Sequence, residues 1–97
     1  MSYSLRFLPS AKREWDKLGS TVKEQFKSKL AERLEDPEVP ADRLHGRLNF
    51  YKIKLRSAGY RLVYEVEKGE LIVYVFAIGK RERGQMYSRA FRRIRES

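Results

Sequence analysis

Hydrophobic and polar residues alternate with a period of two through residues 51–66, which read "YKIKLRSAGYRLVYEV". Because successive side chains of a β-strand point to opposite faces, this alternation predicts two strands joined by a short turn. The predicted apolar face consists of Tyr51, Ile53, Leu55, Tyr60, Leu62, Tyr64 and Val66. The opposite face is mainly cationic and carries Lys52, Lys54, Arg56 and Arg61, followed by Val63 and Glu65.

The turn of this hairpin must have two or four residues, because a three-residue turn would place Leu62 opposite Lys54. The two allowed registers place Arg61 opposite either Lys54 or Arg56. Like charges directly opposite each other in a sheet are unfavourable, by about a few tenths of a kcal/mol or more. Both registers carry this repulsion, which raises the question of what the cationic face is for.

The residues before the hairpin predict a strand at 3–8 and then two helices. The first helix begins at Pro9, has an apolar stripe and stops near Gly19. In the second, Thr21 and Glu24 have the spacing of a capping box, and apolar residues recur every four positions until Pro37. We expect these helices to form a hairpin that covers one face of the sheet. Their carboxylates lie at helix-surface spacing with Lys and Arg, so we interpret them as solvated ion pairs.

The residues after the hairpin predict a central strand and a final helix. Residues 71–79, "LIVYVFAIG", are apolar at both odd and even positions, which indicates a strand covered on both sides. The tail has an apolar stripe at helical spacing against an Arg-rich opposite face, so we expect it to cover the second face of the sheet. This stripe consists of Met86, Tyr87, Ala90, Phe91 and Ile94. Residues 36–47, with two prolines and a glycine, are expected to form a loop.

The net charge of +9 lies entirely in the second part of the chain. Residues 1–42 hold 8 Lys/Arg and 8 Asp/Glu, whereas residues 43–97 hold 14 and 5. A field of this sign attracts phosphates, anionic lipid headgroups or an acidic protein. The alternative is a solvated basic surface that keeps the protein soluble.

Length and composition limit the class of protein. A chain of 97 residues can bury one modest core, so we expect a single domain over residues 1–97. The chain has no cysteine, which excludes disulfides and thiolate metal sites. It begins without the apolar core of a signal peptide, and no apolar run approaches the roughly 18 residues that a membrane-spanning helix needs. We therefore expect a soluble, cytoplasmic protein without a membrane partner.

The residue inventory excludes several kinds of catalytic site. His45 is the only histidine, so a two-histidine ribonuclease mechanism and a multi-histidine zinc site are excluded. No cluster of Asp and Glu accompanies the basic face, which does not fit a magnesium nuclease. We expect no metal ion and no other cofactor.

The remaining candidates for chemistry are three cations of the hairpin face together with Arg81 and Tyr87. Such a cluster could simply bind a phosphate. It could also catalyse, because an ammonium group among other cations is pushed toward neutrality and can then accept a proton near neutral pH. Arginine suits a pentavalent phosphorane, since its forked donors match the oxygens and keep their charge.

Three segments of the sequence, together with the position of Tyr87, resemble the RelE toxins of bacterial toxin–antitoxin systems: "LGSTVKEQF", "YKIKLRSAGYRLVYEV" and "GKRER". The resemblance covers nearly the whole chain. It implies a compact α+β domain, with an N-terminal strand and two-helix hairpin packed on a small, mostly antiparallel sheet, and a C-terminal helix. It also implies a ribonuclease that cuts mRNA in the ribosomal A site without metal, by attack of a ribose 2′-hydroxyl on the adjacent phosphate.

The resemblance assigns roles to individual residues. Lys52 and Lys54 would supply the base and contact the phosphate, Arg61 would steady the phosphorane, Arg81 would aid the leaving oxygen, and Tyr87 would stack on a base. The expected contacts with RNA and the ribosome are Arg43, His45, Arg47, Arg56, Lys80 and Arg83. His45 departs from the family, in which a basic residue stands beside the loop glycine. The expected partners are mRNA, the 16S rRNA of the ribosome and a cognate antitoxin, with a monomer when free and a hetero-oligomer with the antitoxin.

Two alternatives remain from the sequence. One is a non-catalytic toxin of the same fold that inhibits DNA gyrase, although such toxins lack this combination of Lys, Arg and Tyr. The other is a free-standing RNA-binding module, which would need exposed aromatic residues among the basic strands. Only Tyr87 and Tyr60 qualify for that role.

Overall fold

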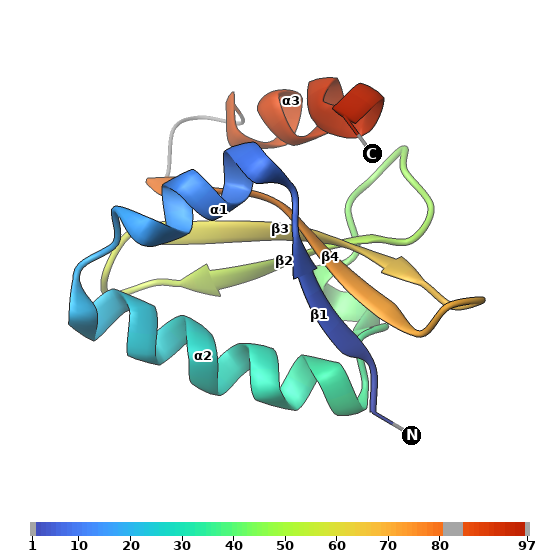
Figure 1. The fold of residues 1–97 in the computed structure, drawn as a ribbon, viewed down its shortest axis with the longest axis horizontal. Helices are drawn as coiled ribbons and strands as arrows, with labels where there is room; N and C mark the ends of the chain where they lie inside the picture. The colour runs from blue at the N-terminus through green and yellow to red at the C-terminus, as the bar shows by residue number, and fades with distance from the viewer. Residues whose placement is uncertain (1, 81–84, 97) are drawn as a thin grey trace.

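The structure, a computed structural model, describes residues 2–80 and 85–96 and has helices on both sides of a four-stranded sheet (Figure 1). The strands lie in the order β1-β4-β3-β2, with β1 parallel to β4 and the other pairs antiparallel. The elements are β1 (Ser4–Phe7), α1 (Pro9–Asp16), α2 (Ser20–Glu35), η1 (Pro40–Asp42), β2 (Phe50–Leu55), β3 (Tyr60–Glu67), β4 (Ile72–Lys80), α3 (Gln85–Arg92) and η2 (Arg93–Glu96). This architecture confirms the predicted α+β fold with a C-terminal helix.

The β2–β3 hairpin has the longer of the two allowed turns. Lys54 pairs with Arg61 and Leu55 with Tyr60, which leaves residues 56–59 in the turn. Gly59 has φ +70°, a backbone conformation that a residue with a Cβ adopts only with strain. Of the two registers that the sequence allowed, the structure therefore has the one that places Arg61 opposite Lys54, and both side chains point to the same face of the sheet.

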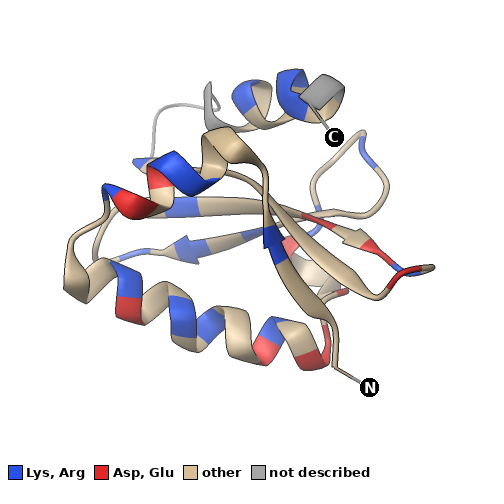
Figure 2. Cartoon of the chain, in the orientation of Figure 1, with Lys and Arg blue, Asp and Glu red and all other residues tan. Residues whose placement is uncertain are grey.

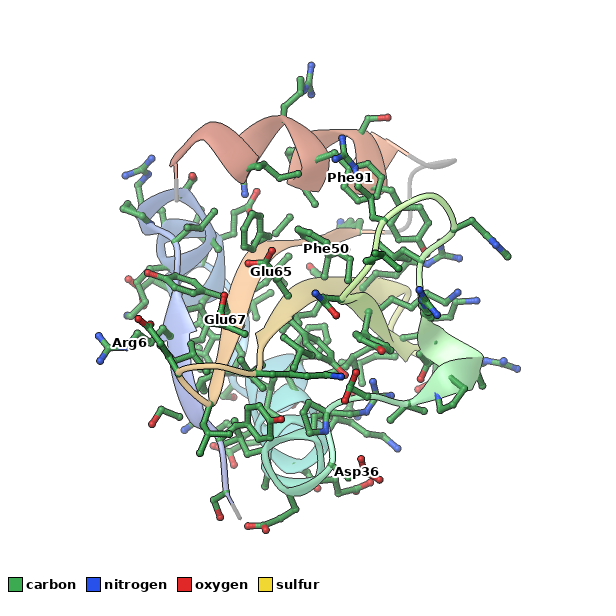
Figure 3. The ribbon with its side chains drawn as sticks, turned by 90° about the vertical axis from the view of Figure 1, so that its right-hand side faces the viewer. Arg6, Asp36, Phe50, Glu65, Glu67 and Phe91 are labelled. Atoms are coloured by element: carbon green, nitrogen blue, oxygen red, sulfur yellow. The ribbon has the colours of Figure 1, made fainter. Side chains whose placement is uncertain are left out.

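The helices α2 and α3 cover opposite faces of the sheet (Figures 1 and 3). Phe26 and Leu30 of α2 are almost fully buried against one face. On the other face, the ring of Phe91 from α3 packs edge-on against Phe50 of β2, with the centroids 5.7 Å apart. The expectation that the tail helix covers the second face is confirmed.

The central strand β4 is buried on both sides, as its two-sided apolar pattern predicted. Its pairing with β3 shifts by one residue, because Tyr64 pairs with Val75 whereas Val63 pairs with Ala77. The extra residue, Phe76, packs edge-on against Phe50 at 5.1 Å. This β-bulge adds an aromatic ring to the face that α3 covers.

Helix α1 lies along the edge of β4 rather than beside α2, so only α2 fulfils the expectation that a helical hairpin covers one face (Figure 1). The strand β1 stops before Pro9 while β4 continues to Lys80, which leaves an edge of β4 for α1 to cover. The Trp15 ring of α1 reaches Phe7 and Phe26, with centroids 5.3 and 6.4 Å away. The helix closes the sheet edge and still contributes to the core.

The helix ends differ from the prediction at Gly19 and at Thr21. Gly19 is the N-cap of α2 with an extended backbone, φ −66° and ψ 157°, instead of the residue that stops α1. The capping box predicted from Thr21 and Glu24 is absent, because α2 begins at Ser20 and no side chain caps it. The expected loop at 36–47 contains the short helix η1.

Candidate active site

Three cations of the hairpin lie together on the sheet face that α3 covers. Lys52 and Lys54 alternate with buried residues on β2, and Arg61 of β3 pairs directly with Lys54. All three side chains are partly exposed. Figure 2 shows Lys and Arg positions in blue on β2 and β3. The acidic residues Glu65 and Glu67 lie farther along β3, toward its turn into β4. Strand β3 therefore has a cationic end and an acidic end.

Tyr87 of α3 completes this group. Its hydroxyl accepts a hydrogen bond of 2.9 Å from Nη1 of Arg61. The guanidinium carbon of Arg61 also lies 5.7 Å from the centroid of the Tyr87 ring. The structure thus brings together four of the five predicted catalytic residues, and the fifth, Arg81, lies outside the described residues.

The cationic surroundings lower the pKa of one lysine. The positive charge of Lys52 lowers the pKa of Lys54, and desolvation and the charges of Arg61 and Arg56 act in the same direction. A lower pKa increases the fraction of Lys54 that is neutral and able to accept a proton. This arrangement supplies a candidate general base next to a fixed guanidinium.

Two cavities flank the cluster. One of about 240 Å³ lies at the hairpin turn and is lined by Lys54, Leu55, Arg56, Gly59, Tyr60 and Arg61. The other, of about 170 Å³, is lined by Arg43, Leu44, His45, Lys52, Tyr87 and Phe91. The first is dominated by cations and suits a phosphate, whereas the second combines apolar and aromatic walls with basic residues, as sites for an unstacked base do.

The residues predicted to contact RNA or the ribosome surround this cluster. Arg43, His45 and Arg47 lie on the exposed loop before β2, and Arg56 lies on the hairpin turn. The guanidinium of Arg47 lies 5.0 Å from the Phe91 ring centroid, which brings this loop against α3. Lys80 is the exposed last residue of β4, and Arg83, like Arg81, lies outside the described residues.

Arg33 supports the cluster from the opposite face of the sheet, a role that the sequence pattern did not reveal. Its Nη1 donates to the backbone oxygen of Lys52 at 3.2 Å and to the hydroxyl of Tyr64 at 2.8 Å. Its Nη2 pairs with Asp42 of η1. Burial raises the pKa of Tyr64 to about 12, so this hydroxyl remains protonated and donates to Pro37 O at 2.6 Å. Arg33 therefore ties the loop before β2 to the strand that carries Lys52.

Glu14 is a second residue whose role the sequence did not reveal. The interpretation of the helix carboxylates as solvated pairs holds for Asp16 with Lys12 but is wrong for Glu14. The Glu14 carboxylate is largely buried and accepts hydrogen bonds from Arg93 and from the backbone of β4. Only the fold brings these partners together, so no local pattern could have indicated them.

The described residues contain no group of three or more His, Cys, Asp or Glu side chains placed to hold a metal ion. Among the same residues, no helix has the length and apolar character needed to cross a membrane.

Comparison with known proteins gives one family. Residues 5–84 match the family described as "ParE toxin of type II toxin-antitoxin system, parDE". The chain is 54% identical over 94 residues to the "mRNA interferase toxin RelE" of Escherichia coli K12, covering 97% of this chain and 99% of the relative. It is 43% identical over 95 residues to a "Putative RelE-like toxin protein" of Escherichia coli, covering 98% and 100% of the two chains.

The solved structures that this chain resembles include those of E. coli RelE. The free R81A/R83A mutant of E. coli RelE superimposes with a TM-score of 0.89 at 52% identity, covering 97% of this chain and 99% of that one. The toxin chain of the intact E. coli RelBE toxin–antitoxin complex matches with a TM-score of 0.81 at 54% identity, covering 84% and 100%.

Proposed function

Because the chain belongs to the RelE/ParE family of toxins of type II toxin–antitoxin systems, we propose that it is an endoribonuclease that cuts mRNA in the ribosomal A site. The 2′-hydroxyl of one ribose attacks the adjacent phosphate, the bond from phosphorus to the 5′ oxygen breaks, and no metal ion takes part. The observation that carries this proposal is the grouping of Lys54, Arg61 and Tyr87 on one sheet face.

Each residue of the group has a step that suits its chemistry. Neutral Lys54 accepts the proton of the attacking 2′-hydroxyl, which its lowered pKa favours. Arg61 donates to the equatorial oxygens of the phosphorane, and its hydrogen bond to Tyr87 fixes the guanidinium in advance. Lys52 contacts the phosphate, and Arg81 stabilises the negative charge on the leaving 5′ oxygen. The leaving 5′ oxygen takes a proton from water, so cleavage yields a 2′,3′-cyclic phosphate and a free 5′-hydroxyl.

The ribosome has two tasks in this proposal. A lysine is a weak base even with a lowered pKa, so the reaction depends on RNA held with its 2′-hydroxyl in line with the scissile phosphate. The ribosome supplies that geometry by holding the codon. The exposed cations around the cluster contact 16S rRNA and the mRNA backbone, because phosphate contacts fix position without reading sequence.

A cognate antitoxin controls the toxin in the cytoplasm. E. coli RelE has been solved in the intact RelBE complex, and its R81A/R83A mutant with an antitoxin RelBc peptide. We extend this to the present chain, as a monomer when free and a hetero-oligomer with its antitoxin. A partner with an acidic, apolar segment would displace α3 and cover the cationic face at once, moving Tyr87 away from Arg61.

A direct assay separates this function from gyrase inhibition on the same scaffold. Primer extension on ribosomes programmed with mRNA should show cuts within the A-site codon, and DNA supercoiling by gyrase should continue unchanged. Lys27→Ala is the matched control for loss of a cation, because Lys27 is exposed on α2. Intact mRNA together with blocked supercoiling would establish the gyrase alternative.

A further inference from the structure

The carboxylate of Glu14 joins three elements of the fold. Its Oε1 accepts a hydrogen bond of 3.0 Å from the backbone N–H of Ile78 in β4. The guanidinium of Arg93 binds both oxygens, with Nη1 2.8 Å from Oε1 and Nη2 3.2 Å from Oε2. Glu14 itself belongs to α1, so one carboxylate connects α1, the edge of β4 and the C-terminal segment.

The same contacts fasten the C-terminal segment to the backbone of β4. Arg93 Nη1 also donates to Phe76 O at 3.0 Å. Arg89 of α3 donates from Nη2 to Ile78 O at 3.3 Å, and its Nε lies 3.5 Å from Oε2 of Glu14. The segment is therefore attached through directional bonds as well as through the packing of Phe91 on Phe50.

These bonds are shielded from water. The side chains of Glu14 and Arg93 are only 21% and 15% exposed. A bidentate pair between a carboxylate and arginine fixes the relative orientation of the two groups, and removal of one partner leaves a poorly solvated charge. By contrast, the side chains of the Lys12–Asp16 pair on the same helix are 54% and 57% exposed.

The C-terminal segment needs such a fixed orientation. Helix α3 spans only Gln85–Arg92, and isolated helices shorter than about 12 residues are marginal in water. Apolar contacts at Phe91 favour docking but are not directional, so they leave the rotation of the helix poorly defined. Tyr87 must nevertheless place its hydroxyl within 2.9 Å of Arg61.

We propose that Glu14 is a positioning residue of the active site: by holding Arg93 it sets the orientation of α3 and thereby places Tyr87 against Arg61. This inference rests on the proposed function for its effect on cleavage. The effect on α3 and on Tyr87 is structural and can be measured without any cleavage assay.

The first test removes the charge of Glu14 and keeps its shape. Gln at position 14 can still accept from Ile78, so Glu14→Gln should fold, and Arg93→Gln breaks the same pair from the other side. Amide hydrogen exchange of residues 89–94 should become about ten-fold faster in both variants, and the NMR signals of the Tyr87 ring should move. Asp16→Asn, which breaks the exposed pair on the same helix, should change neither. Wild-type protection and unmoved Tyr87 signals in both pair-breaking variants would overturn the proposal.

The second test asks whether the pair acts through Tyr87. Under single-turnover conditions on programmed ribosomes, Glu14→Gln should cut about ten-fold more slowly with little change in the concentration needed for half-maximal rate. In a Tyr87→Ala background the same substitution should add almost no further loss, because the positioned group is already gone. Equal losses in both backgrounds, or wild-type rates for Glu14→Gln, would contradict a positioning role. If the wild-type protein does not cut at all, the proposed function fails, while exchange and the Tyr87 signals still decide whether Glu14 places Tyr87.

Discussion

Nη1 of Arg61 donates a 2.9 Å hydrogen bond to the hydroxyl of Tyr87, across 26 positions of the sequence. This bond joins the sheet to the C-terminal helix at the center of the cationic face. It holds a guanidinium in place before any RNA arrives, which is the condition under which a hydrogen-bond donor is most effective for a developing charge.

Loss of Arg61 should therefore reduce cleavage strongly and leave the fold intact. We expect Arg61→Ala, and likewise Arg81→Ala, to lose about 2 to 4 kcal/mol of transition-state stabilisation, the range for one preorganised donor. Single-turnover primer extension measures this loss, with Lys27→Ala as the control. Rates within about three-fold of wild type for both variants would contradict the assignment.

The cleavage rate should depend on the pKa of Lys54. The rate should rise with pH as Lys54 loses its proton and level off above its lowered pKa. Arg56→Gln removes one of the charges that lower this pKa, so the pKa should rise and the profile should move to higher pH. Single-turnover rates measured across pH for the two proteins test this, and a shift to lower pH would be inconsistent with Lys54 as the base.

The cationic cluster should reduce the stability of the folded protein. The pKa of Lys54 is lower in the folded state than in the unfolded chain. Between these two pKa values the unfolded state binds more protons, so the free energy of unfolding rises with pH there, and below both values the full destabilisation remains. Lys54→Met removes the repulsion and should raise the melting temperature near neutral pH while abolishing cleavage. A lower melting temperature for Lys54→Met would show that the repulsion does not govern stability here.

The tail should be required for cleavage and largely dispensable for binding the antitoxin. Deletion of residues 85–97 removes Tyr87 and should abolish cleavage, whereas the antitoxin, which would take the place of α3, should lose little affinity. Calorimetric titration and hydrogen exchange of the complex test this. An antitoxin footprint confined to residues 10–36, with α3 more protected in its docked position, would rule out displacement.

The sequence predicts those features whose cause lies in nearby residues. The alternation at residues 51–66 limits the hairpin to two registers and places Lys52, Lys54 and Arg61 on one face, as the structure confirms. The apolar stripe of the tail likewise predicts α3. Such local periodicity requires no knowledge of the partner element.

Features that depend on distant partners could not be predicted in this way. Glu14 meets the backbone of Ile78 across 64 positions, and Arg33 meets Tyr64 across 31. In the sequence, both residues look like ordinary charges on helix surfaces. The position of α1 also depends on the unequal lengths of β1 and β4. The sequence pattern of α1 itself gives no information about those lengths. The capping box of Thr21 and Glu24 failed because the N-cap of α2 is Gly19, two residues before Thr21, so Thr21 lies inside the first turn.

The most direct test of the central claim compares ribosome-bound mRNA with the same RNA free in solution. With the purified protein in a polyamine buffer, primer extension should show cuts in the A-site codon of the bound mRNA, unchanged by EDTA on ribosomes that remain intact. Naked RNA should be cut far more slowly, because nothing holds its 2′-hydroxyl in line with the phosphate. Equal rates on naked and bound RNA would indicate a general ribonuclease, and loss of cleavage with EDTA would contradict the metal-free mechanism.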